Sequence, residues 1–215
     1  MSMERVEWLI RGIRPLMQNN PAAMAAAATA EGTARQSGST RRTSVKPDSP
    51  DYEQARAKLY VSNGHFYHPA QAAWTSIVQA CPNTKIGKTA TSGIVPPALD
   101  LVVEELILCD PATLGPKEPV PLTEEDWLLD RRFVPTTDGK GKVVGIYVPR
   151  PKWPRWGVVL PLFTERDVIP ERYTSVITDI LNIAGTRGWG SGRLRKGPNG
   201  WVGIRMGKFT AELRV

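Results

Sequence analysis

Two histidines, His65 and His68, are the side chains in this sequence best suited to proton transfer near neutral pH. A single histidine can act as the general base in metal-independent RNA cleavage. Neither histidine has an acid or a tyrosine in a position that the sequence identifies as a catalytic partner. We therefore expect no catalytic residue and no enzymatic activity, and interpret the pair as residues of a hairpin and of the start of a helix. An endoribonuclease that uses His65 or His68 is the alternative.

Other patterns that resemble chemical sites lack an essential residue. Ile86-Gly87-Lys88-Thr89 imitates the end of a phosphate-binding P-loop, but the first glycine of that motif would fall at position 82, which is a proline. The acidic clusters at 104–105 and 124–126 are interpreted as charges at a strand end and a helix start. We expect no metal and no cofactor.

The excess positive charge is concentrated near the C-terminus. From residue 185 to residue 215 there are seven basic residues and one acid, a difference of +6 within a net charge of +7 for the whole chain. Glycines, basic residues and tryptophan together are typical of a surface that holds phosphates and stacks on bases. A solvated basic hairpin is the alternative. The candidate contacts are Arg187, Gly188, Trp189, Gly190, Gly192, Arg193, Arg195, Lys196, Arg205 and Lys208.

A second basic run lies in the middle of the chain, where no acid occurs between residues 139 and 164. Aromatic rings stack on any base, so basic residues that alternate with tryptophans predict a sequence-tolerant platform for a single strand. The alternative is that prolines and tryptophans protect a sheet edge. The candidate contacts are Arg150, Lys152, Trp153 and Arg155, and elsewhere in the sequence Arg41 and Arg42, which otherwise belong to a soluble tether.

The composition is that of a globular protein. The chain has 215 residues, of which 41% are hydrophobic. No apolar run approaches the roughly 18 to 20 residues that span a bilayer, and the first residues lack the pattern of a signal peptide. We expect a cytoplasmic protein without membrane association and a single domain over 1–215. Cys81 and Cys109 match no metal or disulfide spacing, and we expect buried thiols.

Strand and helix patterns alternate along the first half. Alternating apolar residues predict a strand over 4–13. Asn63-Gly64 between two β-rich runs predicts a hairpin over 58–68, because both residues tolerate the positive φ of a tight turn. Apolar residues at helical spacing predict a helix over 70–80. Residues 99–108 are predicted as one strand, with a short helix as the alternative.

Residues 20–57 interrupt this pattern. Residues 22–30 are nearly all alanine, and residues 31–51 are rich in Gly, Ser, Thr and Arg without an apolar period. Such a segment buries too little apolar area to offset the entropy of ordering it. We expect a low-complexity insertion or arm that is held by a neighbouring subunit or a bound strand, and hence a homo-oligomer or filament.

The second half predicts a further helix and several strands. An amphipathic helix over 170–184 is followed by Gly185 as its C-cap, and the final strand is 201–204 or 208–213. Before the helix, a proline-rich loop over 110–126 leads to strands over 132–135, 143–148 and 156–163. The order of elements is a decorated βαββαβ, which predicts an α+β sheet with both helices on one face and added hairpins.

Three of these features resemble the RAMP superfamily, the ferredoxin-like RNA-binding proteins of CRISPR systems. They are the first strand, the Tyr67-His68-Pro69-Ala70 start of a helix, and a C-terminal helix that runs into Ala184-Gly185 and a loop of alternating glycines. The layout is also similar to small bacteriophage proteins of that type. The resemblance covers most of the chain outside residues 20–57.

The resemblance implies a ferredoxin-like, RRM-like core and a phage-encoded protein of the host cytoplasm. It also implies that the glycine loop approaches a nucleic-acid backbone, where a Cβ would block close contact. Together with the basic composition, it predicts non-catalytic binding of single-stranded RNA or DNA. A structural phage protein whose basic surface meets another protein is the remaining alternative.

Overall fold

The computed structural model is a mixture of a few helices and several antiparallel sheets, so the predicted α+β class is confirmed. No helix in the part of the chain that is described is long and apolar enough to cross a bilayer. The described residues are 3–21, 49–86, 88–137, 143–165, 167–169, 174–191, 195–197, 200–202 and 205–214.

The central sheet has four strands, and each neighbouring pair is antiparallel. The strand predicted over 4–13 is confirmed and forms the second position of the sheet. Its Trp8 and Ile10 have no exposed surface and lie in the main core, whereas Leu9 lies in a smaller cluster with Cys109. In spatial order the strands are β14 (Phe209–Leu213), β1 (Met3–Gly12), β11 (Gly157–Glu165) and β7 (Leu99–Leu101).

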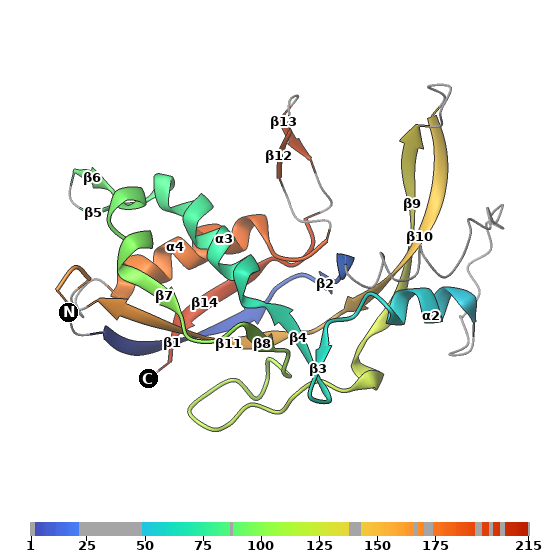
Figure 1. The fold of residues 1–215 in the computed structure, drawn as a ribbon, viewed down its shortest axis with the longest axis horizontal. Helices are drawn as coiled ribbons and strands as arrows, with labels where there is room; N and C mark the ends of the chain where they lie inside the picture. The colour runs from blue at the N-terminus through green and yellow to red at the C-terminus, as the bar shows by residue number, and fades with distance from the viewer. Residues whose placement is uncertain are drawn as a thin grey trace.

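Two helices pack against each other over one face of this sheet (Figure 1). They are α3 (Ala70–Ala80) and α4 (Thr174–Arg187), close to the predicted ranges. The buried side chains Ile77 and Ile180 contribute to the main core. The indole Nε1 of Trp8 donates a hydrogen bond to Oγ1 of Thr178 at 2.9 Å, which ties α4 to the sheet beneath it.

Gly185 is not the C-cap that the sequence predicts, because α4 continues to Arg187. A Cβ at Gly185 would collide with the backbone carbonyl oxygen of Phe209. The glycine therefore lets the helix lie directly on β14. The chain leaves the helix at Gly188, whose φ of +82° places it in the left-handed region that favours glycine after a helix.

Two β-hairpins project on the same side of the molecule in Figure 1, one on either side of a short strand, β2 (Leu16–Met17). The longer one consists of β9 (Leu128–Thr137) and β10 (Val143–Trp153), which pair in antiparallel register and extend beyond the predicted strands 132–135 and 143–148. The shorter one consists of β12 (Arg195–Gly197) and β13 (Gly200–Val202). The strand predicted over 208–213 is β14, and the one over 201–204 belongs to this separate hairpin.

The predicted strand over 99–108 is wrong as a single element. It divides into β7 in the central sheet and β8 (Glu105–Ile107), which pairs with β4 (His65–Pro69) in another sheet. The hairpin with Asn63-Gly64 is confirmed, since β3 (Val61–Ser62) pairs with β4 and both turn residues have positive φ. The remaining short elements are β5 (Lys85–Ile86), β6 (Thr89–Ala90), and 3-10 turns at Cys81–Asn83, Thr91–Gly93, Pro96–Ala98 and Glu124–Asp126.

The end of the predicted insertion is a packed helix, α2 (Pro50–Arg56). The Ser49 side chain accepts a hydrogen bond from the backbone N–H of Tyr52, which begins the helix. The Tyr52 ring stacks on Trp127 with 4.6 Å between ring centroids, and Ala55 has no exposed surface. This part of the predicted insertion therefore folds as a helix that packs on the core of the protein. Residues 22–48 lie outside the described residues.

Candidate nucleic-acid interface

The two basic segments predicted separately from the sequence meet at β2. On one side, Lys152 and Trp153 of β10 pair with Met17 and Leu16. On the other side, the backbone N–H of Ser191, in the loop that follows α4, donates to the carbonyl oxygen of Met17 at 2.7 Å. The structure thus places β10 and the glycine loop on either side of one two-residue strand.

The loop from Gly188 to Ser191, called the glycine loop below, is packed against the chain itself. Gly188 and Gly190 have φ of +82° and +71°. A Cβ at Gly188 would collide with the Met206 carbonyl oxygen, and one at Gly190 with the Met17 carbonyl oxygen. The sequence predicted that these glycines leave room for the backbone of a ligand. In the structure they leave room for the backbone of the protein itself.

The two tryptophans predicted as stacking surfaces lie in the core, so their predicted exposed position is wrong. Trp153 and Trp189 each have 0% of their surface exposed. The Trp189 ring contacts Phe209 with centroids 4.5 Å apart and Trp156 at 5.8 Å, and the Trp153 ring contacts Phe66 at 5.0 Å. Neither indole can stack on a base without unfolding its surroundings.

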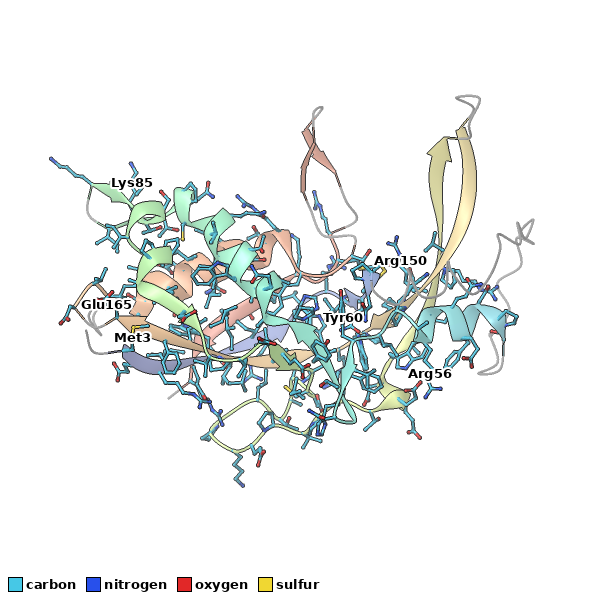
Figure 2. All side chains as sticks on the ribbon, in the orientation of Figure 1. Met3, Arg56, Tyr60, Lys85, Arg150 and Glu165 are labelled. Atoms are coloured by element: carbon cyan, nitrogen blue, oxygen red, sulfur yellow. The ribbon has the colours of Figure 1, made fainter. Side chains whose placement is uncertain are left out.

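Arg150 links the two basic segments directly. Its Nη1 donates a hydrogen bond to Oγ of Ser191 at 2.7 Å, from β10 to the glycine loop. Figure 2 shows Arg150 between the bases of the two projecting hairpins. On β10 the side chains alternate, so Pro149 and Pro151 are buried while Arg150 and Lys152 lie on the partly exposed face.

The other predicted cations differ in their surroundings. Lys152 forms an ion pair with Asp130 at 3.6 Å, and the exposed Arg155 pairs with Asp110 at 3.4 Å. Nη1 of Arg187 donates to the carbonyl oxygen of Gln79, which points this side chain toward α3. Only part of the predicted set therefore gathers at β2.

Arg205 and Lys208 lie in a turn that is hydrogen-bonded to the glycine loop. The backbone N–H of Trp189 donates to the carbonyl oxygen of Gly207 at 3.0 Å, and the N–H of Gly207 donates to that of Pro15 at 2.8 Å. These bonds hold the 205–208 turn between the glycine loop and the start of β2. The Arg205 side chain is exposed and Lys208 is half-buried.

Four predicted contacts cannot be placed. Arg41, Arg42, Gly192 and Arg193 lie outside the described residues. Arg195 and Lys196 belong to β12, but only their backbone is described.

Lys58 is a residue of this region that the sequence did not single out. Its side chain is only 8% exposed, and its Nζ donates a hydrogen bond to the Pro149 carbonyl oxygen at 2.6 Å. Burial, followed by the nearby charge of Arg150, lowers the pKa of Lys58 from its ordinary value of 10.5. The sequence does not indicate that Lys58 is buried, because lysines are rarely buried even where their neighbours in the sequence are apolar.

The two histidines occupy different environments. The His68 ring is buried and lies nearly parallel to Trp189, with centroids 5.7 Å apart. His65 is exposed on the β3–β4 hairpin, where it lines a groove of about 510 Å³ that also includes Arg56 and Glu124. Those two side chains form an ion pair at 3.1 Å. The β3–β4 turn points away from the two projecting hairpins in Figure 1.

Both cysteines are buried free thiols, as predicted. The Cys109 thiol donates to the Gly157 carbonyl oxygen at 3.2 Å. Burial, followed by the charge of Asp110, raises the pKa of Cys109 to about 12. The thiolate that would act as a nucleophile or metal ligand is therefore scarce at neutral pH.

No protein-family model matches this sequence, and no curated protein matches it.

Proposed function

We propose that this chain binds single-stranded nucleic acid without catalysis, through the surface around β2. The observation that carries the proposal is the meeting of the two basic segments there, joined by the bond from Arg150 to Ser191. Arg205 and Lys208 add positive charge beside the same loop. A concentration of cations on one surface attracts a polyanion and releases its counterions.

The burial of Trp153 and Trp189 changes the expected mode of binding. With these rings unable to stack on bases, contact with phosphates supplies most of the affinity. Phosphate contacts carry no sequence information directly. The proposed binding is therefore sequence-tolerant and strongly dependent on salt.

We also propose that the central sheet is a ferredoxin-like core, as the resemblance to the RAMP superfamily implies. Strand order supports this. Along the chain, β1 is followed by α3 and β7, and β11 by α4 and β14, while the order in the sheet is β14-β1-β11-β7. This order supports a split βαβ arrangement, in which each helix joins two strands that are separated by a third.

The phage origin, the cytoplasmic location and the association of copies along a strand remain parts of this proposal. The oligomer hypothesis rests on the composition of 20–57, most of which lies outside the described residues.

The test is a titration of labelled single-stranded DNA, single-stranded RNA and duplex over a series of salt concentrations. The double variant Arg205→Gln, Lys208→Gln should bind more weakly and with a flatter salt dependence, by about 0.7 in the log-log slope for each phosphate that the variant no longer neutralises. The matched control is Arg56→Gln, Lys117→Gln, which removes the same charges away from β2 and should leave binding unchanged.

Two results would contradict the proposal. Absence of binding to any single strand at low salt would favour a structural protein whose basic surface meets another protein. Formation of RNA cleavage products in EDTA that is abolished in His65→Ala would favour the endoribonuclease alternative.

A further inference from the structure

Two tyrosines form a partly exposed aromatic pair beside the surface around β2. Tyr60 directly precedes β3 and Tyr67 lies on β4, and the backbone N–H of Tyr67 donates to the carbonyl oxygen of Tyr60 at 3.1 Å. Their ring centroids are 5.5 Å apart, with an angle of 54° between the ring planes. Phe66 and His68 of β4 are buried, so Tyr67 lies on the opposite, partly exposed face of the strand.

The two residues that follow β2 connect this pair to β10. The backbone N–H of Gln18 donates to the carbonyl oxygen of Pro151 at 3.2 Å, and the side-chain amide of Gln18 donates to that of Tyr67 at 2.6 Å. The Tyr60 hydroxyl donates to the carbonyl oxygen of Asn19 at 3.4 Å. The tyrosine pair and the basic strand β10 are therefore attached to the same short segment of chain.

A row of rings connects the pair to the glycine loop as well. The Tyr60 ring meets the His68 ring edge-on with centroids 6.4 Å apart, and His68 in turn lies on Trp189. His68 is 3% exposed and Trp189 is fully buried, so Tyr60 is the ring of this row that reaches the surface. In the view of Figure 2, Tyr60 lies between β4 and Arg150.

This pair is the aromatic surface that a strand held around β2 would meet. The structure describes five aromatic side chains as partly exposed, and of these only Tyr60 and Tyr67 are hydrogen-bonded to the two residues after β2. The other three are Tyr52, Trp74 and Phe163. The alternative is that the two tyrosines only stabilise the β3–β4 hairpin as a pair across its strands.

We propose that Tyr60 and Tyr67 form a stacking platform that takes one base of the bound strand. The phosphates next to that base contact the cations around β2, and the base turns toward the tyrosine rings. Every base has a face that can stack on an aromatic ring, so this contact adds affinity without reading sequence. The platform rests on the proposed function, because it requires a strand at β2.

The first experiment compares two single strands of the same length and sugar, one with a base at every position and one that is abasic throughout. Both carry the same phosphates, so their salt slopes should be equal. The wild-type protein should bind the abasic strand about tenfold more weakly, because the stacking contact is lost. Equal affinity for the two strands would overturn the platform, and this measurement needs no variant.

Variants of Tyr67 assign the difference to this ring. Tyr67→Leu should bind the strand with bases about tenfold more weakly than the wild type and the abasic strand equally well, with unchanged salt slopes. Tyr67→Trp keeps an aromatic ring and should retain the preference for bases. Tyr52→Leu is the matched control, because it removes another partly exposed tyrosine, and it should leave binding unchanged. A folded Tyr67→Leu protein that still prefers the strand with bases tenfold would show that the platform is wrong.

Glu105 offers a test in which affinity increases, which a loss of folding cannot imitate. Glu105 of β8 pairs with Pro69 in the register of β4, so it is a diagonal neighbour of Tyr67 on the same face of this sheet. A carboxylate there repels the phosphates of a strand that passes over Tyr67, so Glu105→Gln should tighten binding about twofold. Glu118→Gln, which removes an exposed acid from the loop after β8, is the control. If Glu105→Gln binds no more tightly than Glu118→Gln, the strand does not pass over the platform.

The same titrations separate this platform from the proposed function. If Arg205→Gln, Lys208→Gln weakens binding while the wild type binds the abasic strand as tightly as the strand with bases, the interface around β2 stands and the platform falls. If no single strand binds at low salt, the proposed function falls and the platform falls with it.

Discussion

The indole of Trp189 lies against the imidazole of His68, with ring centroids 5.7 Å apart and an angle of 17° between the ring planes. The pair joins the glycine loop to β4, two segments distant in the sequence. Phe209 and Trp156 contact the same indole at 4.5 Å and 5.8 Å. Trp189 is therefore a centre of aromatic packing that holds the glycine loop against the core.

This packing predicts that Trp189→Ala lowers the free energy of unfolding by about 3 to 5 kcal/mol, because the substitution leaves a large cavity in the core. Trp189→Phe retains an aromatic ring and should cost less. Urea denaturation followed by circular dichroism measures both. A Trp189→Ala protein with wild-type stability and weakened strand binding would instead support the stacking role predicted from the sequence.

Glycine substitutions separate backbone conformation from close packing. Gly188 has positive φ and its Cβ would meet the Met206 carbonyl, Gly64 has positive φ in open space, and Gly93 has open space without positive φ. Alanine at Gly93 should leave the free energy of unfolding nearly unchanged. Alanine at Gly64 should lower it by about 1 kcal/mol, because the residue must keep a left-handed conformation. The loss at Gly188 should be larger than at Gly64. Denaturation midpoints of the three variants test this order, and equal losses of stability at Gly64 and Gly188 would show that the close approach to Met206 is unimportant.

The spacing of apolar residues predicted the helices and the strand in which buried positions recur at a regular interval. In the strand over 4–13 the alternating residues Val6, Trp8 and Ile10 pack on the main core, although Leu9 between them is also buried, in the smaller cluster. The helices over 70–80 and 170–184 carry apolar residues at helical spacing, and that spacing reflects the face that is buried. The Asn63-Gly64 turn was predictable because its residues have the conformation that the turn requires. These features depend on near neighbours in the sequence.

Features that depend on distant residues were not predictable. Nothing near Gly185 or Gly190 in the sequence shows that Phe209 and Met17 will approach them. The same holds for Trp189, because a tryptophan between glycines and arginines has the composition of an exposed loop, yet positive φ at Gly188 and Gly190 turns the chain so that the ring is buried. The burial of Lys58 and its hydrogen bond to the Pro149 carbonyl likewise arise only when the chain after α2 meets β10.

The carboxylate of Glu7 should make stability sensitive to acid. Burial alone would raise the pKa of Glu7, but hydrogen bonds and charge from Arg214 and Arg5 outweigh it and lower the pKa from its ordinary value of 4.5. Because the folded-state pKa lies below the unfolded-state value, the stabilisation is complete above pH 4.5 and disappears as pH falls through the folded-state pKa. Urea midpoints measured from pH 7 to pH 3 should fall less steeply for Glu7→Gln than for the wild type. Parallel pH profiles would mean that the ion pair with Arg214 adds nothing.

Removal of residues 22–48 tests whether this segment serves association between copies. The backbone N–H of Asn20 donates to the carbonyl oxygen of Lys58 at 3.1 Å, and Tyr52 of α2 stacks on Trp127, so the structure on both sides of the segment has its own contacts. A variant with a short Gly-Ser linker in place of 22–48 should therefore fold with a Tm near that of the wild type.

The same variant should bind short oligonucleotides with wild-type affinity, because the cations around β2 are unchanged. On long oligonucleotides it should lose cooperativity, since cooperative binding along a strand comes from contacts between adjacent copies. The Hill slope on long and short oligonucleotides, compared between the full chain and the variant, measures this directly. Equal slopes for the two proteins on long strands would show that the segment makes no contact between copies and that the oligomer hypothesis is wrong.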